Sequence, residues 1–143
     1  MAKAEINQLF DCEVTQFYKI ITDYEKYPDF LSEVKKCKVV KNEGKKKLVE
    51  FQISVIKTIT YRVWITENEG KGLNWEFESG ELFKVNNGGW TLSDEAGKTR
   101  VVYKIEADFK GFVPGPVAKG LVSVNLPNMM AAYQKRVKQL FHK

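Results

Sequence analysis

Apolar side chains recur at every second position between residues 34 and 109, and no helical periodicity interrupts them. Runs that begin at Val49, Ile59, Leu73 and Val101 show the alternation clearly. A period of two places one face of each strand on the core and the other face in solvent. Most breaks between the runs contain Asn or Gly, residues that favour turns. The pattern predicts about six consecutive strands joined by hairpins in an antiparallel sheet.

Further elements are expected on both sides of these strands. Residues 3–10 alternate loosely and predict a first strand. The next apolar residues fall at the i, i+3, i+4, i+7 spacing of one helix face, namely Val14, Phe17, Tyr18 and Ile21. Pro28 interrupts the segment after this helix, so two short helices are expected. Beyond the loop at residues 110–116 helical periodicity continues to the C-terminus, where Pro127 marks either a kink or the start of a new helix.

An antiparallel sheet with one apolar face must cover that face, and the C-terminal helix is the large element free to do so. We therefore predict an α+β fold in which a curved sheet of about seven strands wraps around a long C-terminal helix, with two short helices after the first strand. The 143 residues are enough for a single domain over positions 1–143, with a core that needs no metal or disulfide. The gap between sheet and helix is a natural ligand cavity.

Several kinds of catalytic and metal site lack their residues. The one histidine, His142, lies next to the C-terminus, and the two cysteines, Cys12 and Cys37, form no CxxC pair. A catalytic triad, a multi-histidine metal site and zinc or thiol–disulfide chemistry are therefore not expected. We expect no catalytic residues and no metal, and a binding protein rather than an enzyme. No apolar segment has the length of a signal peptide or a membrane span, so a cytoplasmic location is expected.

The basic residues are mostly lysine. Of 23 Lys and Arg residues, set against 18 Asp and Glu, only three are arginine. Sequence-specific reading of nucleic acid relies on arginine, so it is not expected here. One lysine cluster surrounds the turn near Gly44 and comprises Lys35, Lys36, Lys38, Lys45, Lys46 and Lys47. It has two interpretations: solvated lysines that protect a sheet edge, or a docking patch for a membrane surface, a ribosome or another anionic partner.

Residues 23–31 place several large apolar side chains in a turn, and fully burying one such side chain contributes about 1.5–3 kcal/mol. An apolar surface must therefore lie beneath them, either the protein core or a ligand cavity. Candidates for the cavity wall come from this turn, the strands and the C-terminal helix: Tyr24, Tyr27, Phe30, Leu31, Trp64, Trp75, Phe77, Phe83, Trp90, Met129, Met130 and Tyr133. Candidates for polar groups inside the cavity are Tyr61, Arg62, Arg100 and Tyr103. For each wall residue an ordinary core position is the alternative.

The element order, the turn Tyr27–Leu31 and the tail segment Asn125–Met130 resemble the START-like (Bet v 1-like) helix-grip superfamily. Within it the chain is similar to the polyketide cyclase/dehydrase and coenzyme Q-binding branch, which includes the bacterial ribosome-association toxin proteins. The coenzyme Q-binding branch commonly continues the turn with Pro-Trp and a cysteine, whereas residues 32–34 here are Ser-Glu-Val. The resemblance implies a cavity for a lipid or for an isoprenoid such as a quinone, and no further cofactor.

Three functional hypotheses fit these observations. The first is a non-catalytic carrier, chaperone or sensor that binds a lipid, an isoprenoid, a quinone or another hydrophobic small molecule, with residues 112–116 and the Tyr27–Pro28 turn controlling the entrance. The second is a polyketide cyclase or dehydratase, which requires at least two polar side chains with shifted pKa values inside the cavity. The third is a ribosome- or protein-interacting module that uses the lysine cluster.

Overall fold

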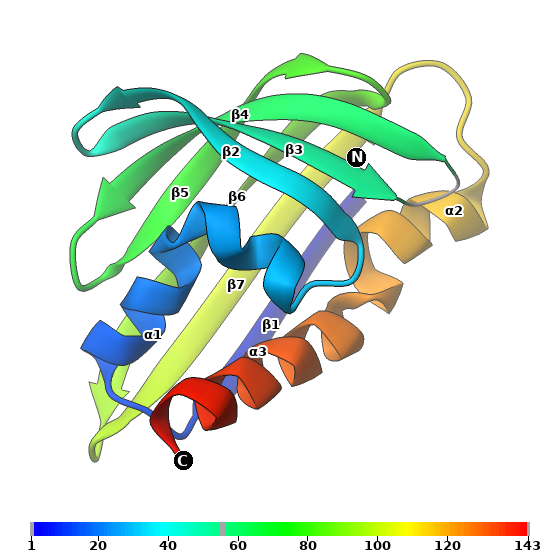
Figure 1. Ribbon diagram of the computed structural model, residues 1–143. Coiled ribbons are helices and arrows are strands. Elements are labelled where there is room, and N and C mark those ends of the chain that lie inside the picture. The colour runs from blue at the N-terminus through cyan, green and yellow to red at the C-terminus, as the bar shows by residue number, and fades with distance from the viewer. Residues whose placement is uncertain (1, 55–56, 143) are drawn as a thin grey trace.

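The computed structural model describes residues 2–54 and 57–142, apart from the side chains of Ser123 and Val124. Within these residues seven strands form one antiparallel sheet in the order β1-β7-β6-β5-β4-β3-β2 (Figure 1). The strands are β1 (Ala2–Phe10), β2 (Val34–Glu43), β3 (Lys46–Ser54), β4 (Thr58–Asn68), β5 (Gly72–Gly80), β6 (Phe83–Glu95) and β7 (Lys98–Phe109). The predicted sheet is confirmed, and β1 and β2 form its two edges.

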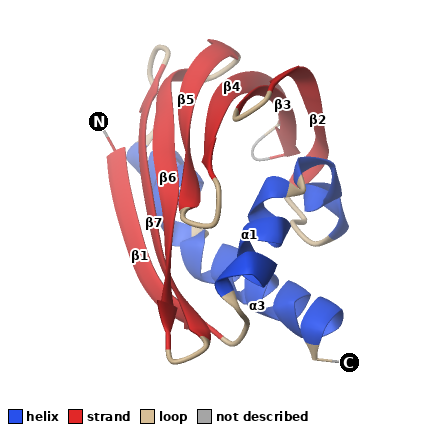
Figure 2. Cartoon of the chain, turned by 90° about the vertical axis from the view of Figure 1, so that its left-hand side faces the viewer, coloured by secondary structure: helices blue, strands red, loops and turns tan. Residues whose placement is uncertain are grey.

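Two short helical segments follow β1, as predicted. Helix α1 (Val14–Thr22) begins where the Gln16 side chain accepts a hydrogen bond from the Glu13 backbone N–H (3.0 Å), which satisfies one free donor at the helix start. The 3₁₀ helix η1 (Tyr24–Asp29) contains Pro28. Both segments lie on the concave side of the sheet, under the curled strands β2 and β3 (Figure 2).

The C-terminal helical region consists of three consecutive segments. These are α2 (Gly115–Lys119), the π-helical turn η2 (Gly120–Val124) and α3 (Leu126–Phe141). Pro127 lies in the first turn of α3, where its missing N–H breaks no helical hydrogen bond, so a new helix begins here. Its buried face comprises Leu126, Met130, Tyr133 and Val137. Among the described residues no helix has both the length and the apolar composition to cross a membrane.

The main core joins the helices to the concave face of the sheet. Phe17 of α1 lies at its centre with none of its surface exposed. Its ring centroid is 4.6 Å from Phe10 of β1, 5.7 Å from Trp90 of β6 and 5.9 Å from Tyr133 of α3. One side chain therefore holds four elements together.

The pairing of β5 with β6 stops halfway along the strands. Backbone pairing covers residues 72–75 of β5, and from there side chains bridge the two strands. The Asn86 Oδ1 atom accepts a hydrogen bond from Trp75 Nε1, and Asn87 Oδ1 accepts one from the Phe77 N–H, each at 3.0 Å. The sequence predicts a bulge or sharp bend at Gly88–Gly89, but the irregular register of β6 lies between residues 83 and 85.

Gly88 allows β7 and the Trp75 side chain to approach β6 closely, which is a different role from the predicted bend. A Cβ atom at Gly88 would lie 2.2 Å from the Lys104 carbonyl oxygen and 2.4 Å from the Trp75 ring. Only glycine therefore lets β7 and the Trp75 side chain come so near to β6.

Candidate ligand cavity

A cavity of about 180 Å³ lies between the concave face of the sheet and the helices η1, η2 and α3. Its wall is mostly apolar and aromatic, and strands β3 to β7 each contribute side chains that point to the concave face of the sheet. Nine of the residues singled out in the sequence meet there: Tyr27, Leu31, Tyr61, Trp75, Phe83, Trp90, Tyr103, Met129 and Tyr133. The fold thus brings together residues that are separated by up to about a hundred positions in the sequence.

Four predicted wall residues are buried or half-buried outside the cavity. Tyr24 packs beside the cavity, and its hydroxyl donates a hydrogen bond to Glu67 Oε2 (2.6 Å). Met130 belongs to the main core, and Phe77 packs against Phe83 in a smaller cluster. Phe30 lies just outside the cavity, where its ring packs edge-on against Tyr133 at 5.1 Å. These four assignments to the cavity wall are corrected by the structure.

Three further predicted residues lie away from the concave face. Trp64 and Arg62 alternate with the inward side chains of β4, so they point to the outer face. There Lys46 Nζ lies 5.0 Å from the Trp64 ring, and Arg62 Nε donates to Glu50 Oε1 (3.0 Å). Arg100 of β7 also faces outward and donates to Glu95 (2.7 Å). The prediction that these residues enter the cavity is therefore wrong.

Sequence reasoning missed part of the wall. The cavity is also lined by Phe51, Ile53, Val63 and Ile105. The period-two alternation places these residues on the inward face, but they were not among the residues predicted to line a cavity. Asn86 is different, because it is a polar residue in an irregular part of β6 and only 5% of its surface is exposed. No signal in the local sequence marks it.

The polar end of the cavity is built around Asn86. Its Oδ1 atom accepts the hydrogen bond from Trp75 Nε1, and its side chain lowers the pKa of Tyr61, against the larger rise that burial causes. The Tyr27 hydroxyl donates a hydrogen bond to the Ile21 carbonyl, and Tyr27 also lowers the pKa of Tyr133, against the larger rise that burial causes. These polar groups fix the aromatic rings of the wall in place.

Burial in this apolar wall raises the pKa of Tyr61, Tyr103 and Tyr133 above the usual value for tyrosine. At neutral pH the three hydroxyls are therefore protonated and can donate hydrogen bonds. No lysine or arginine occurs among the described residues that line the cavity. Among the same described residues the one carboxylate is Glu33, at the rim, and burial raises its pKa as well.

The mouth of the cavity lies between the end of η1 and the start of α3. A second hollow of about 110 Å³ adjoins the cavity there and shares Leu31, Glu33, Val34 and Met129 with it. The sequence placed the entrance at Tyr27–Pro28 and residues 112–116. Tyr27 does line the cavity, whereas Phe112 is 91% exposed and lines neither hollow.

The cavity is small for a ligand site. Drug-sized ligands occupy about 300–1,000 Å³, whereas an apolar cavity of about 150 Å³ holds benzene. A cavity of about 180 Å³ therefore accommodates a compound with a single ring. A longer ligand requires outward movement of Leu31 and Met129 at the mouth, and methionine adapts readily to such changes.

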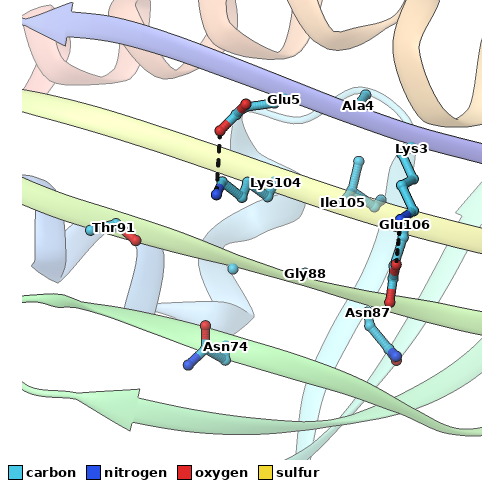
Figure 3. Close-up of a pocket in the computed structure, with 11 residues that line it drawn as sticks. Lys3, Ala4, Glu5, Asn74, Asn87, Gly88, Thr91, Lys104, Ile105 and Glu106 are labelled. Atoms are coloured by element: carbon cyan, nitrogen blue, oxygen red, sulfur yellow. Dashed lines mark ion pairs between the residues drawn. The ribbon is translucent and has the colours of Figure 1, made fainter.

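A larger hollow of about 680 Å³ lies on the outer face of the sheet, across β1, β7, β6 and β5 (Figure 3). It is open to solvent, and its charged groups pair with one another. Lys104 Nζ lies 3.5 Å from Glu5 Oε1, and Lys3 Nζ lies 3.9 Å from Glu106 Oε2. Because its charges are paired at the surface, the apolar inner cavity is the better candidate for a binding site.

The lysine cluster occupies the edge strand β2, the turn after it and the first two residues of β3. Lys38 pairs with Glu50 (3.5 Å), Lys47 pairs with Glu67 (2.8 Å), and Lys46 covers Trp64. Lysines along an exposed edge discourage pairing with another sheet. Docking of a membrane or ribosome on this cluster stays a prediction.

Comparisons with known proteins agree with this geometry. The family described as polyketide cyclase / dehydrase and lipid transport matches residues 11–133. A START superfamily protein from Mycobacterium smegmatis superposes with a TM-score of 0.85 at 19% identity, covering 96% of this chain and 98% of that one. The Zhui aromatase/cyclase from Streptomyces sp. R1128 gives a TM-score of 0.82 at 13% identity, covering 96% and 94%.

The structure of Ara h 8.0201 gives a TM-score of 0.75 at 14% identity, covering 96% of this chain and 98% of that one. A search of curated proteins found no match. At these identities the solved structures establish the START-like helix-grip fold, and the match over residues 11–133 establishes the family. The chain therefore belongs to the polyketide cyclase / dehydrase and lipid transport family.

Proposed function

We propose that this protein binds a hydrophobic small molecule in the cavity between the sheet and α3, as a carrier, chaperone or sensor. The observation that carries the proposal is the aromatic cavity between sheet and helices, with a mouth between η1 and α3. Membership of a family that includes lipid transport supports it. The apolar wall supplies the driving force, since each Å² of apolar surface removed from water contributes about 25 cal/mol.

The cavity volume constrains the mode of binding. A single-ring compound fits the closed form, whereas an isoprenoid or quinone would extend past Leu31 and Met129 into the hollow of about 110 Å³. Both side chains are only partly buried, so their displacement costs less than that of core residues. The cytoplasmic location expected from the sequence stays a prediction.

Native mass spectrometry of the gently purified protein tests this proposal. We expect a bound species that organic extraction releases, or stoichiometric binding after incubation with quinones, isoprenoid alcohols and aryl ketones. An Ile105→Phe variant fills the cavity and should lose binding. Its control is Val102→Phe, which adds the same ring on the outer face of the same strand. Absence of binding by the wild type, or equal binding by both variants, would refute the proposal.

A cyclase or dehydratase is a second candidate, because Tyr61 and Tyr103 bring two polar groups with raised pKa values into the cavity. Neutral hydroxyls of this kind can polarise a carbonyl group by hydrogen bonding. A base would also be needed, and among the described lining residues the carboxylate of Glu33 at the rim is the candidate.

A simple assay tests the catalytic candidate. 2,6-Heptanedione closes by intramolecular aldol addition and loss of one water to give 3-methylcyclohex-2-enone, whose conjugated enone absorbs in the ultraviolet. An enzyme would accelerate the reaction in proportion to protein concentration, and Glu33→Gln would abolish that acceleration. A rate equal to that with the same concentration of heat-denatured protein would remove this candidate.

A further inference from the structure

The hydroxyl of Tyr103 is a polar group in the wall of the cavity. Tyr103 of β7 is 93% buried, since 7% of its surface is exposed, and its hydroxyl has no hydrogen-bond partner in the part of the chain that the structure describes. In the same part of the chain, every fully enclosed side-chain nitrogen or oxygen does have a partner. The Tyr103 hydroxyl is therefore not enclosed by protein, and the space that this residue lines is the cavity.

The surroundings of Tyr103 hold its ring in a fixed position. Its ring centroid lies 4.7 Å from Trp90 and 5.5 Å from Trp75, and both of these residues also line the cavity. The Oδ1 atom of Asn86, another residue of the cavity wall, already accepts a hydrogen bond from Trp75 Nε1. Tyr103 consequently supplies a positioned donor that the protein itself leaves unused.

The charges around the cavity define the ligand further. The described wall contains no cationic side chain, so a carboxylate or phosphate placed inside would lose its hydration without gaining a counter-charge. Glu33 at the rim adds a negative charge that an incoming anion must pass. An uncharged ligand meets neither obstacle.

We propose that the cavity selects uncharged ring compounds that carry an acceptor oxygen, such as aryl ketones, and that this oxygen accepts a hydrogen bond from the Tyr103 hydroxyl. The proposal rests on the ligand-binding function proposed above and names its ligand class. An apolar ligand without oxygen would leave the hydroxyl dry and unpaired, which is costly for a buried donor. Fatty acids, as anions, are disfavoured.

Four probes of nearly the same shape test this selectivity: acetophenone, cumene, benzoate and α-methylbenzylamine. They present a ketone, a purely apolar group, an anion and a cation on the same ring. Dissociation constants at neutral pH would be measured by calorimetry and by tryptophan fluorescence. The proteins are the wild type, Tyr103→Phe, and Tyr24→Phe as a control that removes a buried hydroxyl outside the cavity wall.

For the wild type we expect acetophenone to bind about 2- to 12-fold more tightly than cumene, the range of one neutral hydrogen bond. Tyr103→Phe should abolish this preference while cumene still binds, and Tyr24→Phe should keep it. Benzoate and the amine should bind at least about tenfold more weakly than acetophenone.

An unchanged preference in Tyr103→Phe, or tight binding of benzoate or the amine, would overturn the inference and leave the proposed function in place. Failure of all four probes to bind, cumene included, would overturn the proposed function itself. The two failures are thus distinguishable in a single series of titrations.

Discussion

Replacing Phe17 by alanine tests whether this side chain joins the helices to the sheet. Phe17 is fully buried, and truncation of a buried phenylalanine to alanine costs about 3–5 kcal/mol. A domain of this size typically has only about 5–15 kcal/mol of stability. At about 2–4 °C per kcal/mol, the expected fall in Tm is about 6–20 °C.

The same substitution should change ligand binding, because Trp90 and Tyr133 contact Phe17 and also line the cavity. The space left by the missing ring adjoins the cavity, so a two-ring ligand such as naphthalene should bind Phe17→Ala more tightly than the wild type. A ligand that binds only the folded state should also recover part of the lost stability.

Urea denaturation and calorimetry measure the stability change, and titration with naphthalene measures the change in binding. The control is Phe112→Ala, because Phe112 is 91% exposed and its truncation should change stability by less than about 0.5 kcal/mol. If Phe17→Ala lost no more stability than Phe112→Ala, the central role of Phe17 in the core would be refuted.

Two further substitutions test the sheet. Gly88→Ala places a Cβ 2.2 Å from the Lys104 carbonyl oxygen and should lower the free energy of unfolding, measured by urea denaturation, by at least about 2 kcal/mol. As a control, Gly115→Ala meets no atom within 4 Å and should change that free energy by less than about 0.5 kcal/mol. Equal changes in the two variants would contradict the close approach at Gly88. The hydrogen bond from Arg62 lowers the pKa of Glu50 below its usual 4.5, so this pair stabilises the fold above pH 4.5 and loses that contribution as the pH falls through the lowered value. The stability difference between wild type and Arg62→Leu should therefore shrink in acid, and a difference independent of pH would contradict the ion pair.

Alternation along the chain was enough to predict the sheet and most of the inward face. It placed Tyr61, Val63 and Ile65 together, and the structure confirms that Val63 and Ile65 are buried and that all three line the cavity. The assignment of Trp64 to the cavity wall conflicts with this alternation, because Trp64 has the same strand phase as Arg62. The alternation along β4 determines which face Trp64 lies on: it lies on the outer face, where Lys46 covers its ring.

The buried face of the C-terminal helix was also partly predictable. Helical spacing predicts one face with Met130, Tyr133, Val137 and Leu140, since a helix face is set by residues three or four apart. The first three are buried, whereas Leu140 is 40% exposed, so its assignment was wrong. Whether Pro127 kinks a helix or begins one depends on the preceding backbone, which forms a π-helical turn. Local sequence does not determine that turn, because packing of η2 against β1 and β7 contributes to it.

The sequence by itself determined the strands, their two faces, the aromatic turn and the helix that covers the sheet, because these depend on residues close together in the chain. Only the tertiary structure decided which inward residues surround a cavity and which fill the core. A cavity is the small volume left after closely packed side chains from many elements have met, and its size depends on all of them at once. The spare hydroxyl of Tyr103 has the same origin, because the Oδ1 atom of Asn86 in the same cavity wall is already occupied by the N–H of Trp75.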